Sequence, residues 1–213
     1  MKLIPDIGIN WDGNWELLEL MLKACYDAEI DLVKFQAFGP EHWTHYPQWP
    51  NLKNASVTPQ NIDKIDRLCD NYNLEWFCTP TNHESIDMLE PYVKLYKIRY
   101  LDQNNCPLIE RIKFTKKPWI ISCDNPGRFS QYANTLYCVP KYPPELSDID
   151  FDRIKYYDGY SNHYPGMDIL FKAVQMGAKI LEIHITPSKD MKLADNPVSF
   201  DLDELQEIGA NFK

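Results

Sequence analysis

Polar side chains stand at the ends of the short apolar runs in this sequence, where parallel strands would place a functional site. Lys34 and Gln36 are two residues apart, so they point to one face of a strand, opposite to Val33 and Phe35. Similar positions are held by Asn10, Thr79, Lys97, Arg99, Ser122, Tyr142, Ser161, Asn162, His163, Glu182 and His184. Polar residues at almost every strand end exceed what a purely structural sheet needs, so we expect a ligand site there.

Two lysines, Lys34 and Lys97, lie inside apolar runs. A buried ammonium group without a partner is very costly. Two such groups at one end of a sheet indicate an anionic ligand, either a phosphate or a carboxylate. The sequence leaves the alternative equally open, in which each lysine forms a structural ion pair with a nearby acid.

His163 and His184 follow two neighbouring runs. Neutral imidazoles on adjacent strands can share a metal ion, although two histidines alone are a weak metal signal and a strand histidine is more often a hydrogen-bonded structural residue. Glu182 lies on the same strand face as His184, where it is a candidate ligand or a carboxylate that orients the ring.

Eight β-rich runs alternate with helical stretches along the chain. The runs cover residues 3–9, 31–36, 75–79, 95–98, 118–122, 135–139, 156–160 and 179–186. Asn14 is the predicted cap of a first helix, and further helices are predicted at 59–72, 167–176 and 201–208, with a short or degenerate one at 123–134. This alternation predicts a closed parallel barrel or an open doubly wound sheet, with a modest preference for the barrel.

Composition narrows the function classes. The chain has 213 residues, a net charge of −9 and a pI near 5.0, which predicts one domain (1–213) that binds neither nucleic acid nor an anionic membrane. Without a signal peptide or a long apolar run, the protein is expected to be cytoplasmic, with its six cysteines reduced. Nucleotide-fold, zincin and hydrolase motifs are missing. The aromatic segment 41–50 is a candidate lid or sugar platform, although a plug over one barrel end is slightly favoured.

Seven collinear blocks resemble the N-acetylneuraminate (sialic acid) synthase family. They are residues 6–10 (DIGIN), 33–36 (VKFQ), 78–80 (CTP), 96–98 (YKI), 117–122 (KPWIIS), 159–163 (GYSNH) and 177–184 (GAKILEIH), followed by Asp195. Each block alone is weak, but seven in order across almost the whole chain are specific. The resemblance implies a compact (β/α)8 TIM barrel with its active site at the C-terminal ends of the strands.

The resemblance also implies an activity, which is the condensation of phosphoenolpyruvate with an open-chain N-acetylhexosamine. A divalent metal, Mn²⁺ or Mg²⁺, held by His163 and His184 would polarise the aldehyde. Asp102 would manage protons or the attacking water, while Asp6, Tyr142 and Asp195 would lie near the sugar. Phosphoenolpyruvate would be bound by Lys34, Thr79, Lys97, Ser122 and Ser161, with Gln36 lining the pocket. The partners would be small molecules, and the oligomeric state is not implied.

The chain also departs from the family pattern, mainly around the sugar. The departures are Asp6 for a glutamate, Trp11 for a histidine, Arg99 for a glycine, Tyr100 for a serine, Pro140 for a polar residue and Asn162 for an aspartate. No segment matches the family's C-terminal antifreeze-like domain, which supplies an arginine to a partner's site; Arg99 is either a local replacement or an ion-paired surface residue. These changes predict a different aldehyde. The alternatives are a metal-dependent sugar isomerase, epimerase or aldolase, and a non-catalytic relative that binds a small molecule.

Overall fold

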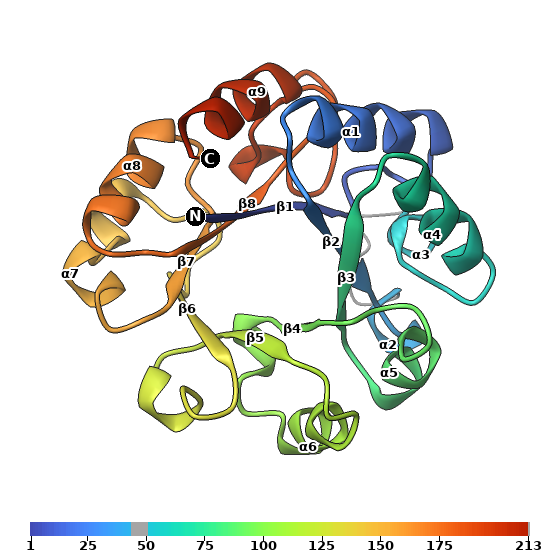
Figure 1. Ribbon diagram of the computed structural model, residues 1–213, viewed down its shortest axis with the longest axis horizontal. Coiled ribbons are helices and arrows are strands. Elements are labelled where there is room, and N and C mark those ends of the chain that lie inside the picture. Colours follow the sequence, from blue (N-terminus) through green and yellow to red (C-terminus); the bar gives the residue numbers. More distant parts are fainter. Residues whose placement is uncertain (44–50, 213) are drawn as a thin grey trace.

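Eight parallel strands close into a barrel in the computed structural model, which describes residues 1–43 and 51–212. The ring runs in sequence order and closes between the last strand and the first (Figure 1). The strands are β1 (Lys2–Gly8), β2 (Leu32–Ala37), β3 (Glu75–Pro80), β4 (Tyr96–Ile98), β5 (Trp119–Ser122), β6 (Asn134–Cys138), β7 (Gly159–Asn162) and β8 (Ile180–His184). The predicted (β/α)8 TIM barrel is therefore confirmed, and the open sheet is excluded.

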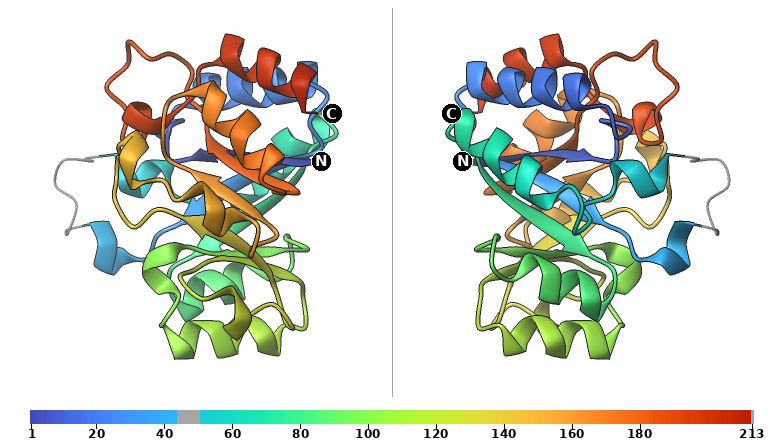
Figure 2. Two further views of the ribbon diagram at one scale, coloured as in Figure 1. Left: turned by 90° about the vertical axis from the view of Figure 1, so that its left-hand side faces the viewer. Right: turned by 90° about the vertical axis from the view of Figure 1, so that its right-hand side faces the viewer.

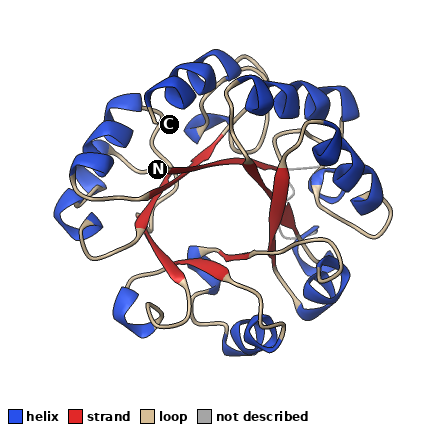
Figure 3. Cartoon of the chain, viewed as in Figure 1, coloured by secondary structure: helices blue, strands red, loops and turns tan. Residues whose placement is uncertain are grey.

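Helices surround this ring of strands on its outside (Figure 3). They are α1 (Trp15–Asp27), α2 (Pro40–Trp43), α3 (Leu52–Ala55), α4 (Ile62–Asn71), α5 (His83–Leu89), α6 (Cys106–Phe114), α7 (Phe151–Ile154), α8 (Met167–Gln175) and α9 (Leu202–Asn211). Four short 3₁₀ turns complete them: η1 (Tyr100–Asp102), η2 (Pro126–Arg128), η3 (Leu146–Asp148) and η4 (Asn196–Val198). Between β5 and β6 the connection holds only η2, as the short segment 123–134 predicts.

Local sequence explains where the first and last long helices begin. The Asn14 side chain accepts hydrogen bonds from the backbone N–H groups of Glu16 and Leu17, which caps α1 as predicted. Asp201 and Glu204 form a capping box at the start of α9. The two helices pack side by side, and the Gln206 side chain of α9 donates to a carbonyl of α1 at 2.7 Å.

Side chains inside the barrel change from apolar to polar along each strand. Near the N-terminal ends, one compact apolar layer is formed by Ile4, Leu32, Phe77, Ile120, Leu136 and Ile180. Two residues further on, the same strand faces carry Asp6, Lys34, Thr79, Ser122, Cys138 and Glu182. The barrel is thus filled by apolar side chains at one end, and its polar interior is confined to the C-terminal end, where α2 projects (Figure 2).

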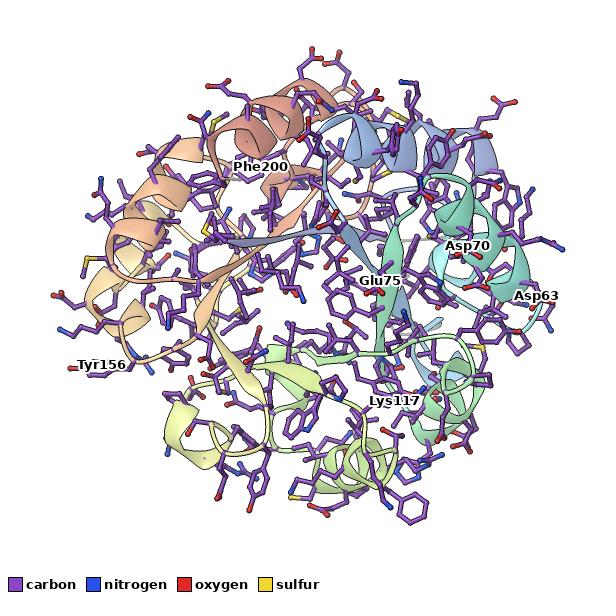
Figure 4. All side chains as sticks on the ribbon, viewed as in Figure 1. Asp63, Asp70, Glu75, Lys117, Tyr156 and Phe200 are labelled. Atoms are coloured by element: carbon purple, nitrogen blue, oxygen red, sulfur yellow. The ribbon has the colours of Figure 1, made fainter. Side chains whose placement is uncertain are left out.

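The seventh strand begins later than the sequence pattern predicts. Residues 156–158 follow α7 as a loop, and Tyr156 is exposed at the periphery of the molecule (Figure 4). A side chain at Gly159 would place its Cβ 2.1 Å from the carbonyl oxygen of Ile180, so glycine is needed where β7 approaches β8. The strand extends to Ser161 and Asn162, so both residues belong to the barrel wall.

Three other expectations concern the cysteines, membrane-spanning helices and the aromatic segment 41–50. All six cysteines are free, five of them buried and Cys106 exposed. Among the described helices, none combines the length and apolar character needed to cross a membrane. The predicted lid or plug at 41–50 lies mostly outside the described residues, because only 41–43 belong to them.

Candidate active site

A cavity of about 330 Å³ opens at the C-terminal ends of the strands. It is lined by every residue to which the resemblance assigned a role except Asp102. These residues are Asp6, Lys34, Gln36, Thr79, Lys97, Ser122, Tyr142, Ser161, His163, His184 and Asp195. A larger cavity of about 650 Å³ shares Phe38 with it but holds none of the predicted site residues. We therefore place the chemistry in the smaller cavity.

The two buried lysines are held by acids inside this cavity. Lys97 Nζ donates to Glu182 Oε1 at 3.0 Å and to Ser122 Oγ at 2.9 Å. Lys34 Nζ donates to Asp6 Oδ2 and lies 3.8 Å from Glu182 Oε2. Of the two readings that the sequence leaves open, the ion pairs are therefore present, and they line a cavity that an anion can enter.

Glu182 is the carboxylate that links the two lysines. Ser161 Oγ also donates to its Oε1, at 2.8 Å. Burial alone would raise the pKa of Glu182, but the ammonium groups of Lys34 and Lys97 outweigh it and lower this pKa to about 2. Burial works against the charge of Lys34, yet Asp6 and Glu182 raise its pKa above the ordinary value. Both partners are thus charged at neutral pH.

The end of β1 brings Asp6 into contact with three other site residues. Asp6 pairs in register with Lys34 of β2 and with His184 of β8, so the sheet itself places it between them. The chain then turns at Gly8, whose φ of +52° favours glycine. A Cβ there would lie 3.2 Å from Asp6 Oδ1 and 3.3 Å from Gln36 Nε2. Glycine at this point therefore leaves the two polar side chains undisturbed.

His163 and His184 lie side by side beneath the ring of Tyr142. Their ring centroids are 5.2 Å apart, and the Tyr142 ring lies 5.0 Å from His163. His184 Nε2 is 3.6 Å from Asp6 Oδ2, and its Nδ1 is 3.5 Å from Asp195 Oδ2. Tyr142 donates its hydroxyl to the other oxygen of Asp195. Two imidazoles and two carboxylates therefore meet at one wall of the cavity.

The chemistry of these donors suits a divalent metal, although they are not gathered into a complete ligand set. Within residues 1–43 and 51–212, no three His, Cys, Asp or Glu side chains converge as a metal site. Desolvation and the neighbouring His184 keep the pKa of His163 well below its usual value, so this ring is neutral and able to ligate. His184 Nδ1 is buried and makes no hydrogen bond. His163 and His184 would supply two nitrogen ligands to such a metal, and water or substrate would supply the remaining ligands.

The lowered pKa of His163 predicts a loss of stability in mild acid. The unfolded chain binds a proton near pH 6.5 whereas the folded protein does not, so the free energy of unfolding should fall as the pH drops below 6.5. Urea unfolding of metal-free protein at about pH 7.5 and about pH 5.5 measures this effect. The His163→Gln variant should have a flatter profile. Glu182 cannot account for the slope, because its protonation lies between 4.5 and about 2.

Asp102 and Arg99 lie beside the cavity and pair with each other. Asp102 ends η1, outside the cavity lining, and accepts a hydrogen bond from Arg99 Nε. Arg99 lines the cavity, and its Nη2 lies 3.1 Å from His42 Nε2. Arg99 is therefore ion-paired, as one of its two interpretations expects. The catalytic role assigned to Asp102 by resemblance stays a prediction, and Asp102 reaches the cavity only through Arg99.

Two further lining residues, Glu182 and Cys138, contact residues that the resemblance assigned to the site. The sequence indicates Glu182 as a strand-end carboxylate beside His184, but it cannot tell that Glu182 meets two lysines across the barrel. Cys138 was treated as a buried thiol, yet it lines the cavity with its sulfur 3.7 Å from His163 Nδ1. The strand pattern contained a signal for it, since Cys138 is two residues beyond the inward-facing Leu136.

Comparisons of sequence and structure relate this chain to known proteins. The sequence profile of the NeuB family matches residues 21–125 and 129–213. The chain is 26% identical to the N,N'-diacetyllegionaminic acid synthase of Campylobacter jejuni, over 97% of this chain and 73% of that protein. It is 24% identical to the N-acetylneuraminate-9-phosphate synthase of Homo sapiens, over 97% and 67%. The structure of an N-acetylneuraminic acid synthetase from Leptospira borgpetersenii superposes with a TM-score of 0.89 at 24% identity, over 99% and 81%.

Proposed function

Because the chain belongs to the NeuB family, we propose that it condenses phosphoenolpyruvate with an aldose to form a nonulosonic, 2-keto-3-deoxy sugar acid. C3 of phosphoenolpyruvate forms a bond to the aldehyde carbon, one water is added, and inorganic phosphate leaves. The two relatives are named for different products, one of which carries a phosphate, so the acceptor is proposed only as an aldose.

Phosphoenolpyruvate would occupy the deep part of the cavity. Lys34 and Lys97 supply two positive charges, and the hydroxyl groups of Thr79, Ser122 and Ser161 surround them. Charge-assisted hydrogen bonds of this kind are stronger than neutral ones and suit both phosphate and carboxylate oxygens. Each of these side chains comes from a different strand, so the rigid barrel holds them in place.

The acceptor aldehyde would lie beside the histidine pair. A divalent metal held by His163 and His184 would act there as a Lewis acid that makes the aldehyde carbon more electrophilic. The Asp6 and Asp195 carboxylates on either side of His184 can accept hydrogen bonds from sugar hydroxyls. The Tyr142 ring lies against His163, and the Tyr142 hydroxyl donates a hydrogen bond to Asp195.

Asn10 helps to hold the backbone of Asp195 in this position. Its side chain donates to the Ile185 carbonyl at 2.8 Å and to Ser199 Oγ at 2.9 Å, and it accepts from the Asp195 backbone N–H at 3.0 Å. The backbone N–H of Phe200 donates to the His184 carbonyl at 2.9 Å, which ties the segment after Asp195 to the end of β8.

Asn10→Ala should therefore lower the free energy of unfolding by about 1–3 kcal/mol, since buried polar groups lose their partners. It should also raise the KM for the aldose and leave the KM for phosphoenolpyruvate unchanged. Urea unfolding and steady-state kinetics measure the two effects. Asn61→Ala, which removes hydrogen bonds in the segment before α4, is the matched control and should leave both KM values unchanged. Equal changes in both KM values for Asn10→Ala would contradict the role.

One observation carries the proposal: five candidate anion-binding side chains and a histidine pair line the same cavity at the C-terminal end of the barrel. The test is phosphate release from phosphoenolpyruvate with Mn²⁺ across a panel of aldoses that includes N-acetylmannosamine. The purified protein is compared with the His163→Ala/His184→Ala variant. We expect aldose-dependent release that the variant lacks. Release that does not require an aldose, or that survives in the variant, would contradict the proposal.

A second candidate function is supported by Tyr100. The Tyr100 hydroxyl donates to Asp124 at 2.7 Å, and Gln103 holds the same carboxylate at 3.0 Å. The tyrosine thus stands in the cavity lining with its hydroxyl already engaged, and Pro140 lines the cavity without a polar side chain. These residues favour a relative that binds phosphoenolpyruvate or a sugar without turnover. Ligand binding without phosphate release for any aldose would support it.

A further inference from the structure

We propose that phosphoenolpyruvate binds tightly only after a divalent cation has bound beside His184, because Asp6 neutralises Lys34 until then. This inference rests on the proposed function and concerns the regulation of the same site. It assigns Asp6 a role as a carboxylate shared between the anion-binding lysine and the cation site.

Before a cation binds, the buried charges of the cavity do not favour the binding of an anion. Lys34 and Lys97 are 3% and 2% exposed, and the carboxylates of Asp6, Glu182 and Asp195 are equally buried, at 1%, 3% and 6%. The carboxylates therefore outnumber the ammonium groups. An anion that enters this low-dielectric space meets no uncompensated positive charge from the buried side chains.

The rim of the cavity does not reverse this balance. Arg99 is paired with Asp102, and Lys141 is paired with Glu145 at 3.0 Å and with Asp148 at 2.8 Å. Together with the two buried lysines, every cation that lines the cavity within the described residues thus has an acid partner from the protein itself.

Asp6 connects the anion site with the histidine pair. The same oxygen, Oδ2, accepts from Lys34 Nζ and lies 3.6 Å from His184 Nε2, while Asp6 Oδ1 is buried without a hydrogen bond. A divalent cation beside His184 would attract this carboxylate and weaken its hold on Lys34. The lysine would then be free to pair with the incoming anion, so each ligand strengthens the binding of the other.

Asp195 provides a matched control. Its Oδ2 is 3.5 Å from His184 Nδ1, a separation like that of Asp6 on the other side of the ring, and its hydrogen bonds go to Tyr142 and not to a lysine. Asp6→Asn and Asp195→Asn remove the same charge next to the same histidine. Only the first removes the carboxylate that accepts a hydrogen bond from Lys34.

The experiment is calorimetric titration of phosphoenolpyruvate, without an aldose, into the EDTA-treated protein and into the protein with buffered free Mn²⁺. For the wild type, Mn²⁺ should tighten binding about tenfold or more. Asp6→Asn should bind phosphoenolpyruvate more tightly than the wild type in EDTA, and Mn²⁺ should then change its affinity less than about threefold. Glu182→Gln should also bind more tightly in EDTA, but it should keep a dependence on Mn²⁺, because Asp6 still pairs with Lys34. Asp195→Asn should keep the wild-type dependence on Mn²⁺.

Equal wild-type affinity with and without Mn²⁺ would overturn this inference and leave the proposed function standing. Full Mn²⁺ dependence in Asp6→Asn would also overturn it, because the dependence would then come from direct contact between the metal and the anion. The absence of any binding in either state would reject both proposals. Circular dichroism verifies that each variant is folded, and the wild-type comparison stands even if one variant is not.

Discussion

Lys97→Ala should reduce aldose-dependent phosphate release on the order of 10²–10³-fold, because it removes a buried positive charge from the proposed phosphoenolpyruvate site. The Lys97 ammonium group donates to Ser122 and Glu182 and is 2% exposed, so water cannot easily replace it. In the variant, Glu182 stays in the cavity with one cationic neighbour and repels the anion. Steady-state phosphate release at saturating aldose measures the loss.

Lys94→Ala is the matched control for this variant. Lys94 also forms an ion pair, with Glu75 at 2.7 Å, but it is exposed and belongs to the opposite end of the barrel. Its removal should leave phosphate release within about twofold of the wild type, because exposed ion pairs contribute little. If Lys97→Ala folds normally and releases phosphate at the wild-type rate, Lys97 does not bind the substrate.

Glu182→Ala should lower the free energy of unfolding by about 3–5 kcal/mol, the usual cost of removing one partner from a buried ion pair. The substitution leaves Lys97, Lys34 and Ser161 without the carboxylate that they share. That loss is a large part of the about 5–15 kcal/mol by which domains are stable. Urea unfolding of the metal-free protein, followed by circular dichroism, measures it.

A double-variant cycle separates the charge from the packing. Lys97→Met removes the cation but keeps much of the side-chain volume, so Glu182→Ala should cost less in the Lys97→Met background than in the wild type. Glu182→Gln keeps the acceptor oxygen for Ser161 and should lose less stability than Glu182→Ala. A loss below about 1 kcal/mol for Glu182→Ala would mean that Glu182 is not an important counter-ion.

Residue patterns alone predict the orientation of several side chains in the cavity. Lys34, Gln36, His184 and Glu182 could each be placed on the inward face of a strand, because alternation along a strand is a property of neighbouring residues. The start of α1 could also be predicted, because the Asn14 side chain caps backbone N–H groups that are only two and three residues further along the chain. The late start of β7 could not be predicted in this way, because β7 pairs with β8 in a close approach at Gly159 that local sequence does not show.

The sequence by itself determined the order of the eight strands, four of the helices and the polar strand ends, along with the family resemblance. Only the tertiary structure decided which charges meet. Asp6 and Lys34 are 28 residues apart, and Glu182 and Lys97 are 85 residues apart, so their pairing depends on strand register and on closure of the barrel. Local patterns carry no information about register across the barrel. For that reason the sequence could place two lysines among the polar strand ends but could not decide whether an anion or the protein's own carboxylates pair with them.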